Sequence, residues 1–120
     1  MTVTVHHLNN SRSQRILWLL EELNTDYDIV PYQRDAETNL APPELKQVHP
    51  LGKSPLIEDN GLQVAESGAI IQYLCERHGG GSWLPEADTE DHVRHLEWMQ
   101  FGESSFFVPV MLKLYTGRLG

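Results

Sequence analysis

Residues 2–32 read TVTVHHLNNSRSQRILWLLEELNTDYDIVPY, and this stretch decides the fold. It opens with alternating β-branched residues up to Leu8, which predicts a short strand. Residues 11–24 carry apolar side chains at the i, i+3, i+4, i+7 spacing of one helical face: Ile16, Leu19, Leu20 and Leu23. Residues 27–32 alternate again and predict a second strand. A strand, a helix and a strand within about 30 residues predict a right-handed βαβ unit with parallel strands.

The next part of the chain predicts a loop, a short helix and a β-hairpin. Residues 35–43 are polar and contain two prolines, and residues 44–48 form at most a short helix. Two short apolar runs, 56–59 and 62–65, flank Asn60-Gly61. This dipeptide favours the type I′ turn of a hairpin.

A third helix is expected for residues 67–78, with Gly79 at its end. The resulting order is βαβαββα, which predicts an α/β domain over residues 1–80, with helices on the faces of a small mixed sheet. The glycine-rich segment that follows predicts a linker over residues 81–87.

Residues 88–120 form a second part of the chain, and their apolar pattern is helical, with Pro109 as the expected kink. A lone helix does not bury its own apolar side. A second chain or further residues are therefore expected to cover its large apolar side chains: Phe106, Phe107, Met111 and Leu114.

Composition excludes several classes of protein. Lys and Arg number 9 and Asp and Glu 17, so the net charge is −8, which argues against a nucleic-acid partner and a polybasic membrane anchor. The single cysteine, Cys75, excludes an intramolecular disulfide and favours a reducing compartment. No apolar run approaches ~18 residues and no signal-peptide pattern opens the chain, so we expect a cytoplasmic protein that does not span a membrane.

The turn between the first strand and the first helix is the first candidate site. A helix N-terminus presents free N–H groups and a partial positive charge, which stabilise an anion. Ser11 is expected either to cap the helix, in a capping box with Gln14, or to contact a ligand. The two roles are compatible.

Two further segments, Gly52-Lys53-Ser54-Pro55 and Glu66-Ser67, are candidates for binding a peptide. A cis bond at Pro55 would turn the N–H and C=O of Ser54 outward, toward an extended peptide. The alternative is an ordinary turn proline beside a solvated lysine. Glu66 and Ser67 lie at a helix start, where they suit an amino-acid zwitterion, and the alternative is that Ser67 only caps the helix.

The histidines do not form a metal site in this pattern. His6 and His7 alternate across a strand, and His92 and His95 share a helix face without a third ligand. We expect solvated or hydrogen-bonded histidines and no metal.

Three strings resemble motifs of the glutathione transferase family: HLNNSRSQR (7–15), PLGKSPL (50–56) and ESGAI (66–70). The chain is most similar to serine-type members, theta-like and bacterial or fungal. The resemblance covers residues 2–80 and extends over 88–120 as the opening helix of the family's C-terminal helical domain. It implies a thioredoxin-like first domain, glutathione as co-substrate and no metal.

The resemblance also implies roles for the residues of the second and third strings. Ser54, helped by a cis bond at Pro55, pairs through its backbone with the cysteinyl part of glutathione. Glu66 and Ser67 hold the γ-glutamyl end, and Lys53 lies near a glutathione carboxylate.

Ser11 matches the serine that contacts the sulfur, with Asn10 and Ser13 as alternates. A free thiol has a pKa of about 8.5, and lowering this pKa by ~2 units requires about 2.7 kcal/mol of stabilisation of the thiolate. A hydrogen bond to a charged acceptor supplies roughly 1.5–3 kcal/mol, and a helix N-terminus adds about 0.3–1 kcal/mol. The Ser11 hydroxyl and the start of the first helix together can therefore meet this need without a general base.

The activity expected from the resemblance is conjugation of glutathione to small hydrophobic electrophiles, by a homodimer. The alternative is a transferase-like protein-interaction module without catalysis. Glutathione-dependent reduction or dehalogenation is a variant, and cysteine-type reduction is disfavoured because residues 9–13 contain no cysteine. Family members are longer and carry further helices, so this chain lacks much of the pocket for the electrophile.

Overall fold

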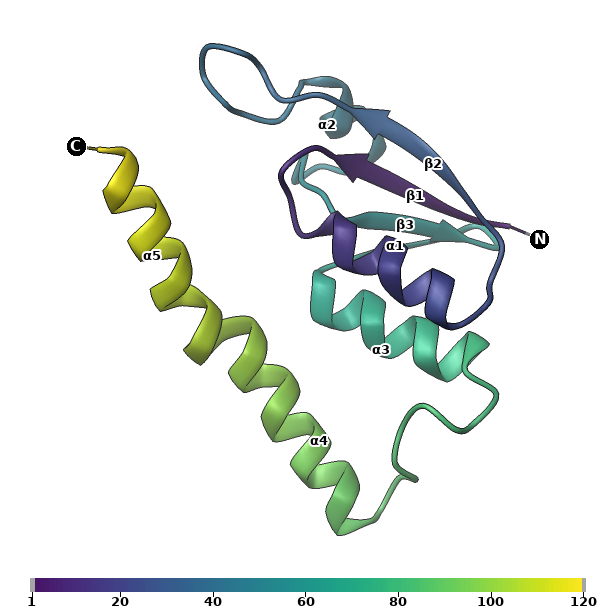
Figure 1. Ribbon diagram of the computed structural model, residues 1–120. Helices are drawn as coiled ribbons and strands as arrows, with labels where there is room; N and C mark the ends of the chain where they lie inside the picture. Colours follow the sequence, from purple (N-terminus) through teal and green to yellow (C-terminus); the bar gives the residue numbers. More distant parts are fainter. Residues whose placement is uncertain (1, 120) are drawn as a thin grey trace.

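The computed structural model describes residues 2–119 and confirms the predicted βαβαββα order of the first domain. Each strand and helix lies within two residues of its expected range (Figure 1). The elements are β1 (Val3–Leu8), α1 (Ser13–Glu22), β2 (Tyr27–Tyr32), α2 (Glu44–Val48), β3 (Leu56–Asp59), β4 (Leu62–Ala65) and α3 (Ser67–His78).

The four strands form one mixed sheet in the order β2-β1-β3-β4. β1 runs parallel to β2, as the βαβ prediction requires, while β3 is antiparallel to both β1 and β4. Asn60 and Gly61 both adopt positive φ, 54° and 84°, which is the backbone of the expected type I′ turn. The predicted mixed sheet is therefore confirmed.

The hydrophobic core lies between the sheet and the helices α1 and α3, which run side by side in Figure 1. Alternation along β1 places Val3 and Val5 on this face, where the apolar stripes of the two helices meet them. The buried cluster consists of Val3, Val5, Ile16, Leu20, Ile57, Ile70 and Leu74.

Two expected helix caps are wrong. Arg12 is the N-cap of α1, and its side chain makes no capping hydrogen bond. The Ser11 hydroxyl accepts the N–H of Ser13 instead of forming a capping box with Gln14. Glu66 is the N-cap of α3, and Ser67 is already its first helical residue. Neither Ser11 nor Ser67 is therefore the N-cap residue of its helix.

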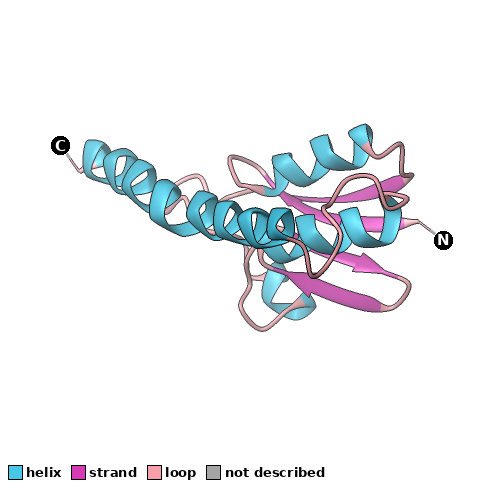
Figure 2. Cartoon of the chain, turned by 90° about the horizontal axis from the view of Figure 1, so that it is seen from below, coloured by secondary structure: helices cyan, strands magenta, loops and turns pink. Residues whose placement is uncertain are grey.

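Beyond the first domain the chain forms a long helical arm, which reaches past the sheet toward the C-terminus in Figure 2. The arm consists of α4 (Glu90–Gln100), the π-helical segment η1 (Phe101–Phe106) and α5 (Phe107–Arg118). The hydroxyl of Thr89, which accepts the N–H of His92 at 3.1 Å, caps α4.

The hydrogen-bond pattern of the arm changes before Pro109, in the π-helical segment η1. Proline has no N–H to bond the carbonyl four residues earlier, Ser105, and this carbonyl lies in η1. A π-helical turn absorbs such a shift of the hydrogen-bond ladder over several residues. The irregularity therefore spreads over η1.

The arm leaves large apolar side chains exposed, as the sequence predicted. Phe106 and Leu114 keep 57% and 46% of their surface in contact with solvent. Within residues 2–119, no helix combines the length and the apolar character needed to cross a bilayer.

Asp59, at the end of β3, is a buried carboxylate that ties the hairpin to α3. It accepts hydrogen bonds from Tyr73 Oη and His78 Nε2, each at 2.9 Å. Burial raises the pKa of Asp59, but the hydrogen bonds from His78 and Tyr73, with the charges of His78 and Arg77, outweigh burial and leave it below its ordinary value. Ionised Asp59 therefore stabilises the fold.

This contribution should disappear in acid. A carboxylate with a depressed folded pKa gives stability that is fully present above its unfolded pKa, about 3.9, and lost as the pH falls through the lower folded value. We expect urea unfolding below about pH 4 to show a steeper loss of stability in the wild-type chain than in Asp59→Asn. Asp28→Asn, an exposed control, should keep the wild-type dependence. Equal pH dependence of Asp59→Asn and the wild-type chain would contradict this role.

Candidate functional site

The turn between β1 and α1 is held in place by Arg34, from the segment after β2. Its backbone N–H donates to Asn9 Oδ1 at 2.8 Å, and its guanidinium donates to the carbonyls of Asn9 and Asn10 at 3.0 and 3.1 Å. Asn10, whose φ is +52°, lies at the tip of the turn and is exposed. The sequence reading missed Arg34, because nothing local links it to the turn.

The two serines of this turn differ in accessibility. Ser11 is half-buried and lines a surface hollow, whereas Ser13 has no exposed surface and lines none of the hollows near it. The Ser13 hydroxyl lies 2.7 Å from His7 Nδ1 and 2.7 Å from Ser11 Oγ. Direct contact with a ligand is therefore open to Ser11 and Asn10, while Ser13 lies behind Ser11.

Ser54 and Pro55 lie at the entry to β3, and the peptide bond between them is cis. The Ser54 hydroxyl donates to the carbonyl of His6 at 2.7 Å, which fixes the loop to β1. Within residues 2–119, the backbone N–H and C=O of Ser54 take part in no hydrogen bond. These two groups are thus available to an extended peptide.

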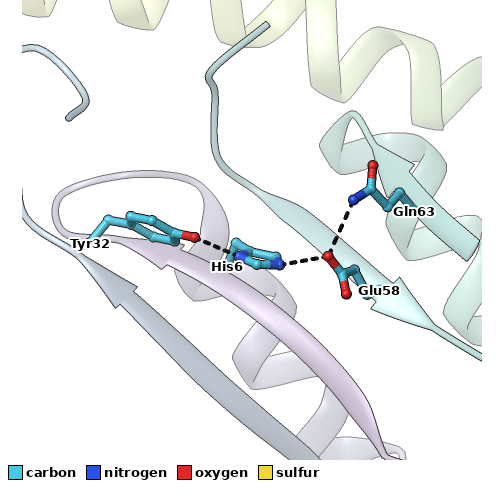
Figure 3. A network of polar contacts seen from close by, with 4 residues as sticks. All are labelled: His6, Tyr32, Glu58 and Gln63. Atoms are coloured by element: carbon cyan, nitrogen blue, oxygen red, sulfur yellow. Dashed lines mark hydrogen bonds and ion pairs between the residues drawn. The ribbon is translucent and has the colours of Figure 1, made fainter. Parts of the chain in front are cut away.

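A polar network on the sheet lies next to this loop (Figure 3). The buried imidazole of His6 on β1 bonds Tyr32 Oη of β2 at 2.9 Å and Glu58 Oε1 of β3 at 3.3 Å, and Gln63 of β4 donates to the same oxygen at 3.2 Å. Burial, with the charges of Glu58 and Glu44, raises the pKa of Tyr32. His6 is therefore a hydrogen-bonded histidine that links β1 to β2 and β3, and Glu58 extends the network to β4.

Glu66 and Ser67 form the start of α3. Glu66 has φ +75° and ψ 122°, a conformation that L residues adopt rarely and at a cost of order 1–3 kcal/mol. Ser67 is only 4% exposed, and its hydroxyl has no hydrogen-bond partner among the described residues. This hydroxyl and the free N–H groups of the first helical turn can bind an anion.

Two hollows join these segments into one surface. The smaller, of about 130 Å³, is lined by Arg12, His49, Leu51, Lys53, Ser54, Pro55, Ala65, Glu66 and Ser67. The larger, of about 1020 Å³, lies between the β1–α1 turn and the arm, and its lining includes Asn10 and Ser11. Arg12 and Ser54 line both. The residues predicted from three separate strings are thus brought together, except that Ser13 lies behind the surface.

The arm is tied to α1 at this surface by Glu103. Glu103 Oε1 accepts from Arg15 at 2.6 Å, and its other oxygen lies 3.5 Å from Arg12. Both guanidinium groups lie over the ring of Phe107, at 4.6 and 4.8 Å from its centroid. Glu103 thus lies between two arginines of its own chain, and it joins the arm to the start of α1.

The larger hollow is basic in a chain whose net charge is −8. Among the described residues that line it there is no acid, but there are four arginines: Arg12, Arg15, Arg34 and Arg118. Glu103 pairs with two of them, so a positive excess remains. Such a surface favours anionic ligands.

The described part of the chain holds no group of three or more His, Cys, Asp or Glu side chains that could bind a metal ion. Cys75 is buried in α3, and burial, with the nearby charge of Glu76, raises the pKa of its thiol. A buried thiol with a raised pKa forms little of the reactive thiolate.

The family model described as glutathione S-transferase, N-terminal domain, matches residues 1–76. The chain belongs to this family. Glutathione S-transferase 1 of Saccharomyces cerevisiae is 40% identical over 98% of this chain and 52% of its own length. Glutathione S-transferase 3 of Schizosaccharomyces pombe is 41% identical over 86% of this chain and 42% of its own. The chain therefore spans about half the length of the curated relatives it matches.

Solved structures of the family share this fold. A glutathione S-transferase of Actinobacillus pleuropneumoniae superposes with a TM-score of 0.85 at 38% identity, covering 98% of this chain and 54% of that one. A glutathione transferase of Phanerochaete chrysosporium, solved with oxidized glutathione, gives a TM-score of 0.68 at 25% identity and covers 86% of this chain and 47% of that one. The thioredoxin-like glutathione transferase fold, followed by a long helix, is thus confirmed.

Proposed function

We propose that this chain binds glutathione, stabilises its thiolate and supports its conjugation to hydrophobic electrophiles, as the glutathione-binding part of a serine-type transferase. The observation that carries the proposal is the small hollow, which is lined by two polar groups available to a ligand. The Ser54 backbone is unpaired among the described residues, and so is the Ser67 hydroxyl in the same hollow. A pure scaffold has no chemical need for this arrangement.

In the proposed complex the tripeptide lies along the joined hollows. Ser67 and the N-terminal N–H groups of α3 hold the α-carboxylate of the γ-glutamyl end, while Glu66 pairs with its amino group. The Ser54 backbone pairs with the cysteinyl part beside cis-Pro55, and Lys53 attracts a carboxylate. This arrangement directs the sulfur toward the β1–α1 turn.

At that turn Ser11 donates a hydrogen bond to the sulfur and the start of α1 adds its partial positive charge. Both stabilise the thiolate relative to the thiol, so the sulfur is nucleophilic at neutral pH. The thiolate then attacks an electrophilic carbon of the second substrate, bound in the larger hollow. The sulfur–carbon bond forms as the leaving group departs or the electrons shift onto the substrate.

The rest of the assembly is also part of the proposal. Residues 88–120 begin the helical second domain, after a linker at 81–87, and the match of the N-terminal domain model to residues 1–76 supports this division. The exposed apolar side chains of the arm support a partner surface, which we assign to further helices and to a second copy in a cytoplasmic homodimer.

Replacing Ser11 tests the chemistry of the proposal. Ser11→Ala should raise the pKa of the bound glutathione thiol by about 1–2 units, because a hydrogen bond to a charged group contributes roughly 1.5–3 kcal/mol. The ultraviolet absorbance of the thiolate, followed against pH in the presence of the 120-residue chain, measures this pKa.

Ser104→Ala is the matched control, because the Ser104 hydroxyl also donates to a backbone carbonyl but lies outside both hollows. It should leave the thiol pKa unchanged. If Ser11→Ala also leaves it unchanged, the sulfur contact passes to Asn10 or a backbone N–H. Failure of glutathione to bind the folded chain at all would instead favour a non-catalytic interaction module.

A further inference from the structure

A chain of three short contacts runs from the end of β1 to the start of α1. His7 Nδ1 lies 2.7 Å from Ser13 Oγ, Ser13 Oγ lies 2.7 Å from Ser11 Oγ, and Ser11 Oγ lies 2.7 Å from the carbonyl oxygen of Leu8. Polar atoms at this separation attract only when a hydrogen lies between them. Each of the three contacts therefore requires its own hydrogen.

The side chains restrict where these hydrogens come from. Each serine hydroxyl carries one hydrogen and a carbonyl carries none. The two serines thus supply two hydrogens for the three contacts, and the third must come from the ring of His7. If His7 Nδ1 were bare, one of the three contacts would be between two lone pairs.

We infer that His7 carries a hydrogen on Nδ1 and that Ser13, held by it, is a positioning residue that frees the Ser11 hydroxyl for the ligand sulfur. The first part concerns the free chain alone. The second part rests on the proposed function, because it needs a thiolate next to Ser11.

The Ser11 hydroxyl is released from the Leu8 carbonyl by rotation of the two serine hydroxyls. When the thiolate arrives, the Ser11 hydrogen turns from the Leu8 carbonyl to the sulfur. The Ser13 hydrogen turns from Ser11 Oγ to the same carbonyl, which lies 3.2 Å away. No hydrogen leaves its own atom, and the contact between the two hydroxyl oxygens lengthens.

Every polar group keeps a partner after this rotation. Ser13 Oγ continues to accept from His7 Nδ1 and from the Leu8 N–H at 3.3 Å, and Ser11 Oγ accepts the Ser13 N–H at 3.2 Å. A bare His7 Nδ1 would instead take the Ser13 hydrogen, so that releasing Ser11 would leave the carbonyl of buried Leu8 without either hydroxyl. An unpaired buried carbonyl is unfavourable, and Ser11 would stay bound to it.

The hydrogen on His7 can be observed in the free protein by long-range ¹H–¹⁵N correlation spectra at neutral pH. We expect His7 to carry hydrogen on Nδ1, in either the neutral or the cationic ring. His49 is an internal control, because its Nδ1 accepts the N–H of Leu51 at 3.3 Å and must be bare. A bare Nδ1 on His7 would overturn the inference without bearing on glutathione binding.

The positioning role is tested by a double-mutant cycle on the pKa of the bound glutathione thiol. Ser13→Ala should raise this pKa by about one unit in the wild-type background, and add nothing in the Ser11→Ala background, since Ser13 acts only through Ser11. Equal increments in both backgrounds, or no increment in either, would overturn the positioning role.

Failure of this inference and failure of the proposed function give different results. If Ser11→Ala raises the thiol pKa and Ser13→Ala does not, only this inference fails. If Ser11→Ala has no effect, the sulfur contact of the proposed function fails and the role of Ser13 with it. If Ser13→Ala does not fold, the His7 spectra of the wild-type chain still decide whether the hydrogen count is right.

Discussion

Ser67→Ala is expected to weaken glutathione binding by about 10–100-fold in calorimetric titration. The Ser67 hydroxyl is nearly buried at the first position of α3 and, among the described residues, has no partner until a ligand enters the small hollow. A hydrogen bond to a carboxylate contributes roughly 1.5–3 kcal/mol, and every 1.4 kcal/mol is about tenfold in affinity. Losing the hydroxyl therefore removes affinity without disturbing an existing internal bond.

The absence of an internal partner makes this variant informative. Many buried hydroxyls bond within the fold, as Ser13 does, and their removal changes stability and function together. Ser67→Ala should unfold at the same urea concentration as the wild-type chain, to within the small effects typical of substitutions that break no internal bond. Ser105→Ala, an exposed serine of η1, is the matched control and should bind glutathione normally. Unchanged affinity in Ser67→Ala would remove the γ-glutamyl contact from the proposal.

The sequence was sufficient for the order of the elements along the chain and for a mixed sheet, because each element has a local signal. Alternation along β1 and the apolar stripe of α1 come from side-chain spacing within each element. The Asn60-Gly61 turn specifies its own backbone, and a parallel βαβ unit allows essentially one handedness. Local pattern and overall fold agree in this region, so little tertiary information was needed.

The helix starts were predicted less well, because the same serine chemistry serves competing roles. A serine before a helix suits an N-cap, but Ser11 bonds the Leu8 carbonyl, and the Ser67 hydroxyl has no partner within residues 2–119. Sequence alone does not distinguish these outcomes, since all of them use one hydroxyl near free N–H groups. The choice depends on what else lies within reach in the folded chain.

The contacts that shape the candidate site from a distance were not predictable at all. Arg15 and Glu103 are 88 positions apart and each looks like an ordinary surface charge in its own helix. Arg34 is likewise 25 positions from Asn9, whose carbonyl it binds. Only the packing of the arm and of the segment after β2 against the β1–α1 turn creates these pairs.

Leu74→Ala is expected to destabilise the chain by about 2–5 kcal/mol. Leu74 has no exposed surface and belongs to the buried cluster that also contains Val5 and Ile57 of the sheet. Truncation removes apolar contact and leaves a cavity that the close-packed strands cannot fill. Urea unfolding followed by circular dichroism measures the loss as a lower midpoint.

The size of this loss also bears on the site, because α3 carries Ser67 at its start and Asp59 bonds its last turn. Leu62→Ala is the matched control, since Leu62 on β4 is 49% exposed and should cost less than about 1 kcal/mol. Since α3 is held to the sheet by its apolar face, the position of the Ser67 hydroxyl depends on the same packing. Equal destabilisation by Leu74→Ala and Leu62→Ala would mean that the packing of α3 on the sheet does not hold this domain together.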